Sequence, residues 1–169
     1  MRISPNYKQA GTHMLALLKV IPLTTGDVCE MGAGFNSTPL LHWITQGRKL
    51  VTYESDPDYY HFAKKFRSRN HKVVKVDDWK DVDFERHWSV VFIDHSVSRE
   101  SKREGKQRGD DAIKFTNADI LILHDSEPEE VENYRYNVVF PKYKYRIDWT
   151  NKPWTSVISN VIDVTKWQQ

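Results

Sequence analysis

The chain has 169 residues, of which 39% are hydrophobic and 28% charged, and its formal net charge is +2. These values indicate a single globular domain over residues 1–169 and exclude global disorder. No apolar run approaches the roughly 20 residues that span a bilayer, and the N-terminus lacks the apolar stretch of a signal peptide. Cys29 is the only cysteine, which excludes an internal disulfide and a cysteine-based zinc site. We therefore expect a cytoplasmic protein without a membrane partner, and the mild positive charge does not favour nucleic acid.

Apolar periodicity and capping residues predict helices and strands that alternate along the chain. The predicted strands cover 27–31, 49–55, 72–76, 89–94, 118–125, 143–149 and 155–163. A helix over 12–20, capped by Thr12, precedes the first strand, and a helix that begins at Ser37 or Thr38 with Pro39 and stops at Gly47 follows it. Asp56 caps a helix after the second strand with Pro57 in its first turn, a short helix over 110–116 precedes the fifth strand, and the capping-box spacing of Ser126 and Glu129 opens a helix after it. This alternation predicts an α/β fold with a doubly wound, mostly parallel sheet and helices on both faces. The last two strands are joined by too few residues for a parallel crossover, so one strand near the edge should be antiparallel.

Polar and acidic residues follow every one of the five predicted parallel strands. In chain order the strand ends deliver Glu30, Gly32, Gly34 and Asn36, then Glu54, Ser55 and Asp56, then Asp77, Asp78 and Trp79, then Asp94 and His95, and finally His124, Asp125 and Ser126. Ligands of open parallel sheets bind at the carboxyl ends of the strands. Carboxylates gathered along one edge repel one another, so their accumulation predicts a ligand site there.

The segment after the first strand is a glycine loop. Gly32 and Gly34 allow a tight turn and close approach of the backbone to a ligand, while Ser37 stands where the dinucleotide fingerprint has its third glycine. Glu54 follows about twenty residues later, at the end of the second strand, where an acid binds two ribose hydroxyls. Together the loop and this acid predict an adenosine-containing ligand.

Glu30 indicates which adenosine ligand this is. A carboxylate two residues before Gly32 would repel a pyrophosphate and attract a cation such as the ammonium or sulfonium of S-adenosylmethionine. On these residues the chain resembles the class I S-adenosylmethionine-dependent methyltransferases. The resemblance covers residues 12 to about 163 and is carried by E-M-G-A-G at 30–34, T-Y-E-S-D at 52–56, V-V-F-I-D at 90–94 and L-I-L-H-D at 121–125. It implies a Rossmann-like, seven-stranded sheet with one antiparallel strand near the edge.

The resemblance also implies a role for each strand end in binding S-adenosylmethionine, with S-adenosylhomocysteine as the product. The methionine moiety would be held by Glu30 and by the loop residues Gly32, Ala33, Gly34, Asn36, Ser37 and Thr38. Glu54 would bind the ribose hydroxyls, with Ser55 and Asp56 beside the adenosine. Asp78, or Asp77 instead, would contact the adenine amino group, and Trp79 would either pack on the ring or be an aromatic residue of a surface loop. Asp94 and His95 would lie next to the reactive methyl group.

The strand end F-I-D-H is similar to catechol O-methyltransferase, in which the aspartate binds magnesium. Asp94 and Asp125 match the two aspartates of that metal site, but Ser126 replaces the amide and the lysine base falls at Val97. A divalent site of Asp94, Asp125 and Glu127 is an alternative that we do not favour. Otherwise both aspartates would bond the backbone or position the substrate.

The acceptor is the least constrained part of the prediction. His95 is our first choice as general base and His124 the second, with Asp94 and Asp125 as further catalytic candidates. After the fourth strand the chain lacks the two prolines and aromatic residue that mark methyltransferases acting on nucleobase amino groups. The basic stretch over 98–111 would be a lid that presents cations or a solvated loop, and the N-terminal segment with Tyr7 and His13 would fold over the cofactor.

We therefore expect a methyltransferase that acts on oxygen or nitrogen of a small polar or anionic substrate. One alternative is an NAD-dependent oxidoreductase, which Glu30 and the missing third glycine oppose. The other is a non-catalytic module that binds an adenosyl ligand or RNA through the basic stretch.

Overall fold

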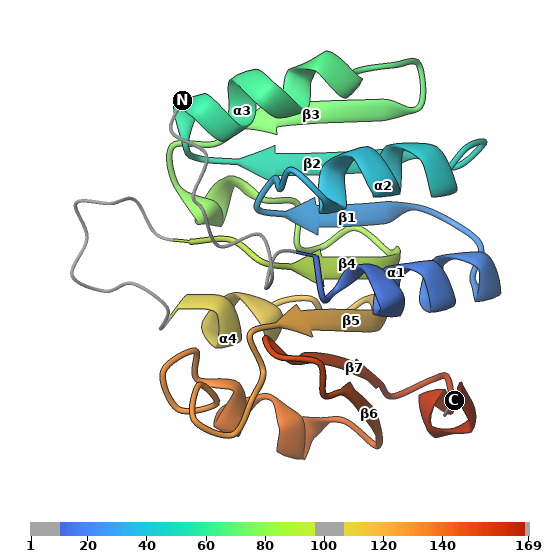
Figure 1. The fold of residues 1–169 in the computed structure, drawn as a ribbon, viewed down its shortest axis with the longest axis vertical. Coiled ribbons are helices and arrows are strands. Elements are labelled where there is room, and N and C mark those ends of the chain that lie inside the picture. Colours follow the sequence, from blue (N-terminus) through green and yellow to red (C-terminus); the bar gives the residue numbers. More distant parts are fainter. Residues whose placement is uncertain (1–10, 97–106, 168–169) are drawn as a thin grey trace.

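The computed structural model describes residues 11–96 and 107–167, and seven strands in these ranges form one sheet (Figure 1). The strands are β1 (Val28–Met31), β2 (Leu50–Glu54), β3 (His71–Lys75), β4 (Trp88–Ile93), β5 (Ala118–His124), β6 (Tyr145–Trp149) and β7 (Thr155–Ser159). Their order across the sheet is β3-β2-β1-β4-β5-β7-β6. Neighbours among β1 to β5 pair in parallel, and β7 is antiparallel to both β5 and β6. The predicted mostly parallel sheet with one reversed strand next to the edge is confirmed.

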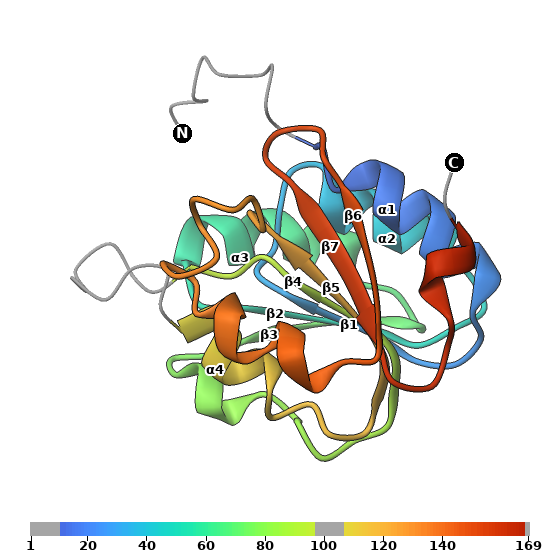
Figure 2. The same ribbon diagram turned by 90° about the horizontal axis from the view of Figure 1, so that it is seen from below.

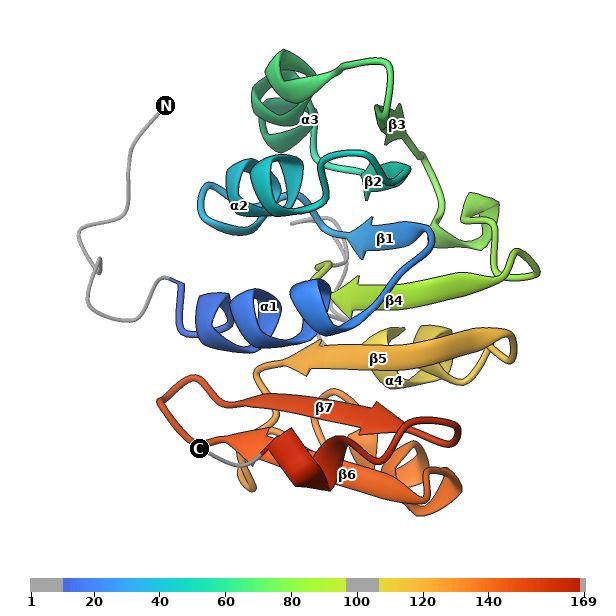
Figure 3. The same cartoon turned by 90° about the vertical axis from the view of Figure 1, so that its right-hand side faces the viewer.

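Helices cover both faces of the sheet, as predicted. α1 (Met14–Val20), α2 (Ser37–Ile44) and α3 (Pro57–Ala63) lie on one side (Figure 3). α4 (Gln107–Ala112) lies on the other side with the turns that precede β6 (Figure 2). No helix within the described ranges is both long enough and apolar enough to cross a membrane.

Two apolar layers, one on each face of the sheet, form the core. Val90 and Phe92 of β4 pack with α1 and α2, whereas Val91 and Ile93 pack on the α4 side. This alternation is the two-residue period of a strand buried on both faces. The same alternation continues past the end of β4, so that the side chains of Asp94 and His95 point to opposite faces of the sheet.

The predicted helix caps are only partly correct. Asp56 caps α3 as expected, because its carboxylate accepts hydrogen bonds from the backbone N–H groups of Asp58 and Tyr59. Thr12 does not cap α1, since its hydroxyl donates to the carbonyl of Pro153 at 2.7 Å. Residue Asn36 takes the N-cap position of α2, so that Ser37 and Thr38 lie inside the helix.

The helix predicted after Ser126 is wrong. Residues 128–135, all of them described, form turns that lead into a short 3-10 helix at Tyr136–Val138. Both capping-box side chains are bound elsewhere: the Ser126 hydroxyl accepts a hydrogen bond from Ser156, and Glu129 pairs with Lys152. Tertiary partners thus replaced the local bonds that would have started a helix.

Two further ends differ from the prediction by four residues. α4 ends at Ala112, whereas a helix was expected over 110–116. β7 ends at Ser159, short of the expected residue 163, because the Ser159 hydroxyl accepts hydrogen bonds from the backbone of Val161 and Ile162 and turns the chain.

Candidate active site

A cavity of about 520 Å³ opens at the carboxyl ends of β1, β2, β4 and β5. This volume is in the range of small-molecule and cofactor sites. Its walls come from the start of α1, the glycine loop, the β2–α3 junction, the ends of β4 and β5, and α4. The lining residues are Gly11, His13, Gly32, Ala33, Gly34, Phe35, Asn36, Glu54, Ser55, Asp56, Pro57, Tyr59, Asp94, Ser96, Arg108 and His124.

The glycine loop is pressed against the end of β4. Gly32 has a φ of +89°, and a Cβ atom built there would lie 2.6 Å from the backbone of His95. Its N–H donates to the carbonyl of Tyr53 in β2. Only glycine fits both the conformation and the space, so this residue joins the glycine loop at the cavity to the end of β4.

Glu54 ties the glycine loop to the start of α3. One carboxylate oxygen accepts a hydrogen bond from the backbone of Ala33 at 2.6 Å, and the other accepts from the backbone of Asp56 at 2.7 Å. The side chain lines the cavity although the residue is only 5% exposed. Burial raises the pKa of Glu54 to about 7.

Glu30, by contrast, lies behind the glycine loop. The residue is fully buried, and its carboxylate accepts hydrogen bonds from the hydroxyls of Thr38 in α2 and Thr52 in β2. The Thr38 hydroxyl also accepts from the backbone N–H of Gly34. Burial raises the pKa of Glu30 to about 7. We expected Glu30 at the ligand, but the structure connects it to the loop through Thr38 instead.

Arg108 of α4 bridges the two aspartates at the far end of the cavity. Its guanidinium lies 3.0 Å from the Asp94 carboxylate and 2.8 Å from that of Asp125, with only 7% of the side chain exposed. Burial alone would lower the pKa of Arg108, but the two carboxylates outweigh burial and shift it upward. A permanent cation therefore stands between Asp94 and Asp125.

The three carboxylates of the alternative magnesium site are not brought together. The guanidinium of Arg108 occupies the space between the two aspartates, and Glu127 accepts a hydrogen bond from the backbone of Trp154 at 2.9 Å. Asp125 itself adopts a left-handed conformation with a φ of 54° and does not line the cavity. Each of these three carboxylates therefore has a protein partner of its own, and the three do not face one common point.

Several predicted cofactor residues also lie outside the cavity walls. His95 is buried on the α4 side, where its Nε2 is 2.9 Å from Asp111 and its ring is 4.4 Å from that of Trp79. Burial lowers the pKa of His95. Asp78 is exposed, accepts a hydrogen bond from the backbone of Lys80 and pairs with its ammonium. The adenine contacts of Asp78 and Trp79 and the role of His95 as base stay predictions.

The structure thus gathers about half of the predicted site. The predicted residues that line the cavity are His13, Gly32, Ala33, Gly34, Asn36, Glu54, Ser55, Asp56, Asp94 and His124, and those that do not are Glu30, Ser37, Thr38, Asp78, Trp79, His95 and Asp125. Sequence reasoning missed Phe35 and Tyr59, whose rings lie 5.2 Å apart at the cavity, and the role of Arg108. An aromatic residue directly after the second glycine of the loop is the sequence signal that could have indicated Phe35. Tyr7, Val97 and most of the basic stretch lie outside the described residues.

No protein-family model matches the chain, and no curated protein matches its sequence. Solved structures do match over nearly its whole length. A methyltransferase from Pyrococcus furiosus is similar with a TM-score of 0.61 at 14% sequence identity, over 96% of this chain and 89% of that one. The chain has the class I methyltransferase fold.

Two human structures share this class I methyltransferase fold. The N-terminal domain of human METTL16 in complex with SAH matches with a TM-score of 0.61 at 13% identity, over 95% of this chain and 74% of that one. The human methyltransferase 10 domain containing protein matches with a TM-score of 0.60 at 15% identity, over 95% of this chain and 85% of that one. The shared fold places the cavity described above at the carboxyl ends of the strands, where open α/β sheets bind their ligands.

Proposed function

We propose that this chain is an S-adenosylmethionine-dependent methyltransferase that acts on oxygen or nitrogen of a small polar acceptor. The observation that carries the proposal is one cavity at the carboxyl edge of a class I methyltransferase sheet. The glycine loop and Glu54 line one end of this cavity, and Asp94 lines the other. The human METTL16 domain with the same fold holds SAH.

The end of the cavity near β2 fits the adenosine part of the cofactor. Glu54 faces the cavity with a carboxylate that can accept the two ribose hydroxyls, and these donors would stabilise its charged form. Phe35 and Tyr59 provide aromatic surface beside it. When bound, S-adenosylmethionine supplies a methyl carbon that its sulfonium has already activated.

The end of the cavity near β4 and β5 fits the methyl acceptor. The task of the protein there is to align the acceptor and exclude water, and Asp94 can accept a hydrogen bond from its hydroxyl or amine. Asp94 and Asp125 carry two negative charges against the single positive charge of Arg108. This balance favours a neutral or cationic acceptor over an anionic one.

Calorimetric titration of the full chain with S-adenosylhomocysteine and with NADH tests the proposal. We expect S-adenosylhomocysteine to bind and NADH not to bind. Glu54→Gln should weaken the affinity about 10- to 100-fold, since hydrogen bonds to a charged group contribute about 1.5–3 kcal/mol each.

Asp58→Asn is the matched control, because it removes the same charge from an exposed position in the first turn of α3. Its affinity for S-adenosylhomocysteine should equal that of the wild type. Binding of NADH without S-adenosylhomocysteine would overturn the proposed function. Unchanged binding by Glu54→Gln would overturn the role of Glu54.

A further inference from the structure

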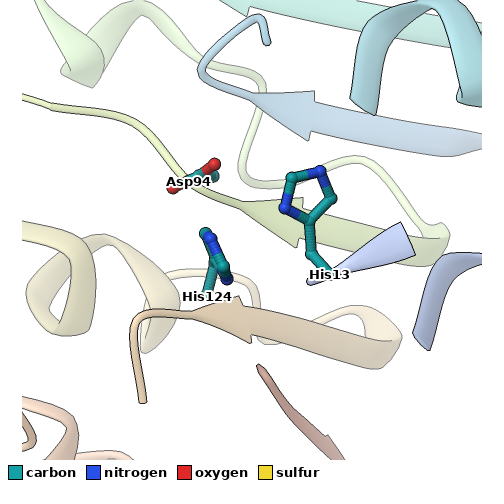
Figure 4. Close-up of side chains that lie close together, drawn as sticks. All are labelled: His13, Asp94 and His124. Atoms are coloured by element: carbon teal, nitrogen blue, oxygen red, sulfur yellow. The ribbon is translucent and has the colours of Figure 1, made fainter. Parts of the chain in front are cut away.

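Three side chains from distant parts of the chain converge at the acceptor end of the cavity. His13 immediately precedes α1, Asp94 follows β4 and His124 ends β5 (Figure 4). One nitrogen or oxygen atom from each lies within 4.8 Å of the others, and all three residues line the cavity. We propose that His13, Asp94 and His124 bind a divalent transition-metal ion.

The first support is the state of His13. The residue is only 5% exposed, yet neither of its ring nitrogens has a hydrogen-bond partner among the described residues. Leaving a buried polar group unpaired costs free energy, and native structures seldom do so without a reason. Its ring packs 4.7 Å from that of His124 and 5.1 Å from that of Phe92, which fixes its place beside the other two ligands.

The second support is the orientation of His124. Its Nδ1 lies 3.2 Å from the Thr155 hydroxyl of β7. A neutral imidazole that donates from Nδ1 to Thr155 carries its lone pair on Nε2, the atom that lies 3.7 Å from Asp125. Metal-binding histidines are held in this way, by a hydrogen bond from the nitrogen that does not touch the ion.

The third support is the charge around the site. Arg108 pairs with one oxygen of Asp94, and among the described residues no hydrogen bond or ion pair holds the other oxygen, which can serve as a ligand. Asp94 and Asp125 together exceed the charge of Arg108 by one negative unit. The site can therefore accept a cation in spite of the neighbouring guanidinium.

The donor set also indicates the kind of ion. Two imidazoles and one carboxylate suit zinc, iron(II), cobalt(II) or nickel(II), whereas magnesium prefers oxygen ligands throughout. Bonds of about 2.0–2.2 Å place the ligand atoms roughly 3–3.5 Å apart, so the three side chains must draw closer together when the ion binds. Three protein ligands leave positions open for water or for the acceptor. That the acceptor would bind there rests on the proposed function, but the metal site does not.

Titration of the metal-free full chain with Co²⁺, Zn²⁺ and Mg²⁺, without any adenosyl ligand, tests the site. We expect one equivalent of Co²⁺ to bind with visible absorption bands, Zn²⁺ to displace it and Mg²⁺ not to do so. His13→Phe keeps an aromatic ring in place and should weaken Co²⁺ binding at least 10-fold, and so should His124→Gln. Thr155→Val touches no metal and should still weaken binding about 10- to 100-fold through the orientation of His124.

His87→Gln is the matched control, because it removes an exposed histidine that pairs with Asp119 outside the cavity. It should bind Co²⁺ like the wild type, and circular dichroism in chelator should show that all variants are folded. Failure of the wild type to bind Co²⁺ and Zn²⁺ would overturn the inference, as would equal losses in His87→Gln and His13→Phe. If the chain binds S-adenosylhomocysteine but neither Co²⁺ nor Zn²⁺, the metal site is overturned and the proposed function stands. If the chain binds Co²⁺ but does not bind S-adenosylhomocysteine in the separate calorimetric titration, the metal site is supported and the proposed methyltransferase is overturned.

Discussion

At the scale of single residues, Arg108 joins the ends of two strands. Its Nε donates to the carbonyl of His95 after β4, and one terminal nitrogen donates to the carbonyl of His124 in β5. The guanidinium also pairs with Asp94 and Asp125 and lies 4.4 Å from the ring centre of Tyr134. The planar fork of arginine matches this set of acceptors, which a lysine ammonium cannot reproduce.

Replacement of Arg108 should therefore destabilise the protein strongly. Arg108→Met leaves two largely buried carboxylates without a partner, and we expect the free energy of unfolding in urea to fall by about 3–5 kcal/mol at pH 7. Arg108→Lys keeps the charge and should cost less. Lys166→Met breaks an exposed pair with Asp163 and should change stability by less than about 1 kcal/mol. Equal effects of Arg108→Met and Lys166→Met would contradict the bridging role.

Glu30 should make stability depend on pH. Its pKa is about 7 in the folded protein, against an ordinary value of 4.5. Between these values the folded state binds a proton that the unfolded state has released, so this contribution to stability is lost as the pH rises. Glutamine does not titrate, so the stability of the wild type relative to Glu30→Gln should fall by about 2–3 kcal/mol from pH 5 to pH 8.

The comparison with Glu30→Gln is needed because buried histidines act in the opposite direction. Burial lowers the pKa of His13 and of His71 to about 4, so their contributions rise with pH over an overlapping range. Urea denaturation of both proteins at each pH isolates the Glu30 contribution. A difference that stays constant from pH 5 to pH 8 would show that Glu30 is charged throughout.

At the scale of elements, β1, the glycine loop and α2 form the unit on which both ends of the cavity depend. The loop contacts β2 through Tyr53 and the end of β4 through His95. Glu30 and Thr38 hold the loop from behind. Movement of this unit would displace Asp94 together with the side of the cavity where we propose that the cofactor binds.

Gly32→Ala tests this dependence. The new methyl group would lie 2.6 Å from the His95 backbone in addition to the strain of a positive φ, so we expect a stability loss of about 2 kcal/mol or more and loss of S-adenosylhomocysteine binding. Gly47→Ala is the matched control, because Gly47 has a φ of +85° with nothing within 4 Å of the added atom. It should show the cost of strain alone in urea denaturation. Equal losses in both variants would mean that the contact with β4 has no effect.

At the scale of the whole molecule, the cavity connects segments that are far apart in the sequence. The proposed cofactor would contact the loop over 32–36 and the β2–α3 junction, whereas β6 and β7 lie at the far edge of the sheet (Figure 1). Binding to the folded state alone stabilises it by mass action. Both the size and the location of the effect are therefore predictable.

S-adenosylhomocysteine at 100 times its Kd should stabilise the chain by about 2.7 kcal/mol, which corresponds to a rise in Tm of about 5–10 °C. Hydrogen exchange should slow most at residues 32–36 and 54–59 and least in the edge strand β6. NADH at the same concentration should leave Tm and exchange unchanged. Protection confined to β6 and β7 would place the ligand elsewhere on the molecule.

Features that depend on residues close together in the chain were predictable from the amino-acid sequence. The strands, their polar ends, the Asp56 cap and the position of Glu54 at the end of β2 follow from periodicity and from bonds between residues a few positions apart. The reversed strand followed from the short connection between β6 and β7. These features are local, so their energies can be estimated without knowing the fold.

The contacts between polar groups that are far apart in the chain depend on the fold and were not predictable from the sequence. The Thr12 hydroxyl donates a hydrogen bond to a carbonyl 141 residues away instead of capping α1. The Glu30 carboxylate accepts hydrogen bonds from Thr38 and Thr52 behind the glycine loop. The Arg108 guanidinium lies between Asp94 and Asp125, and the His13 ring packs against that of His124. A buried polar group takes the partner that packing places within reach, and the distance along the chain does not reveal that partner.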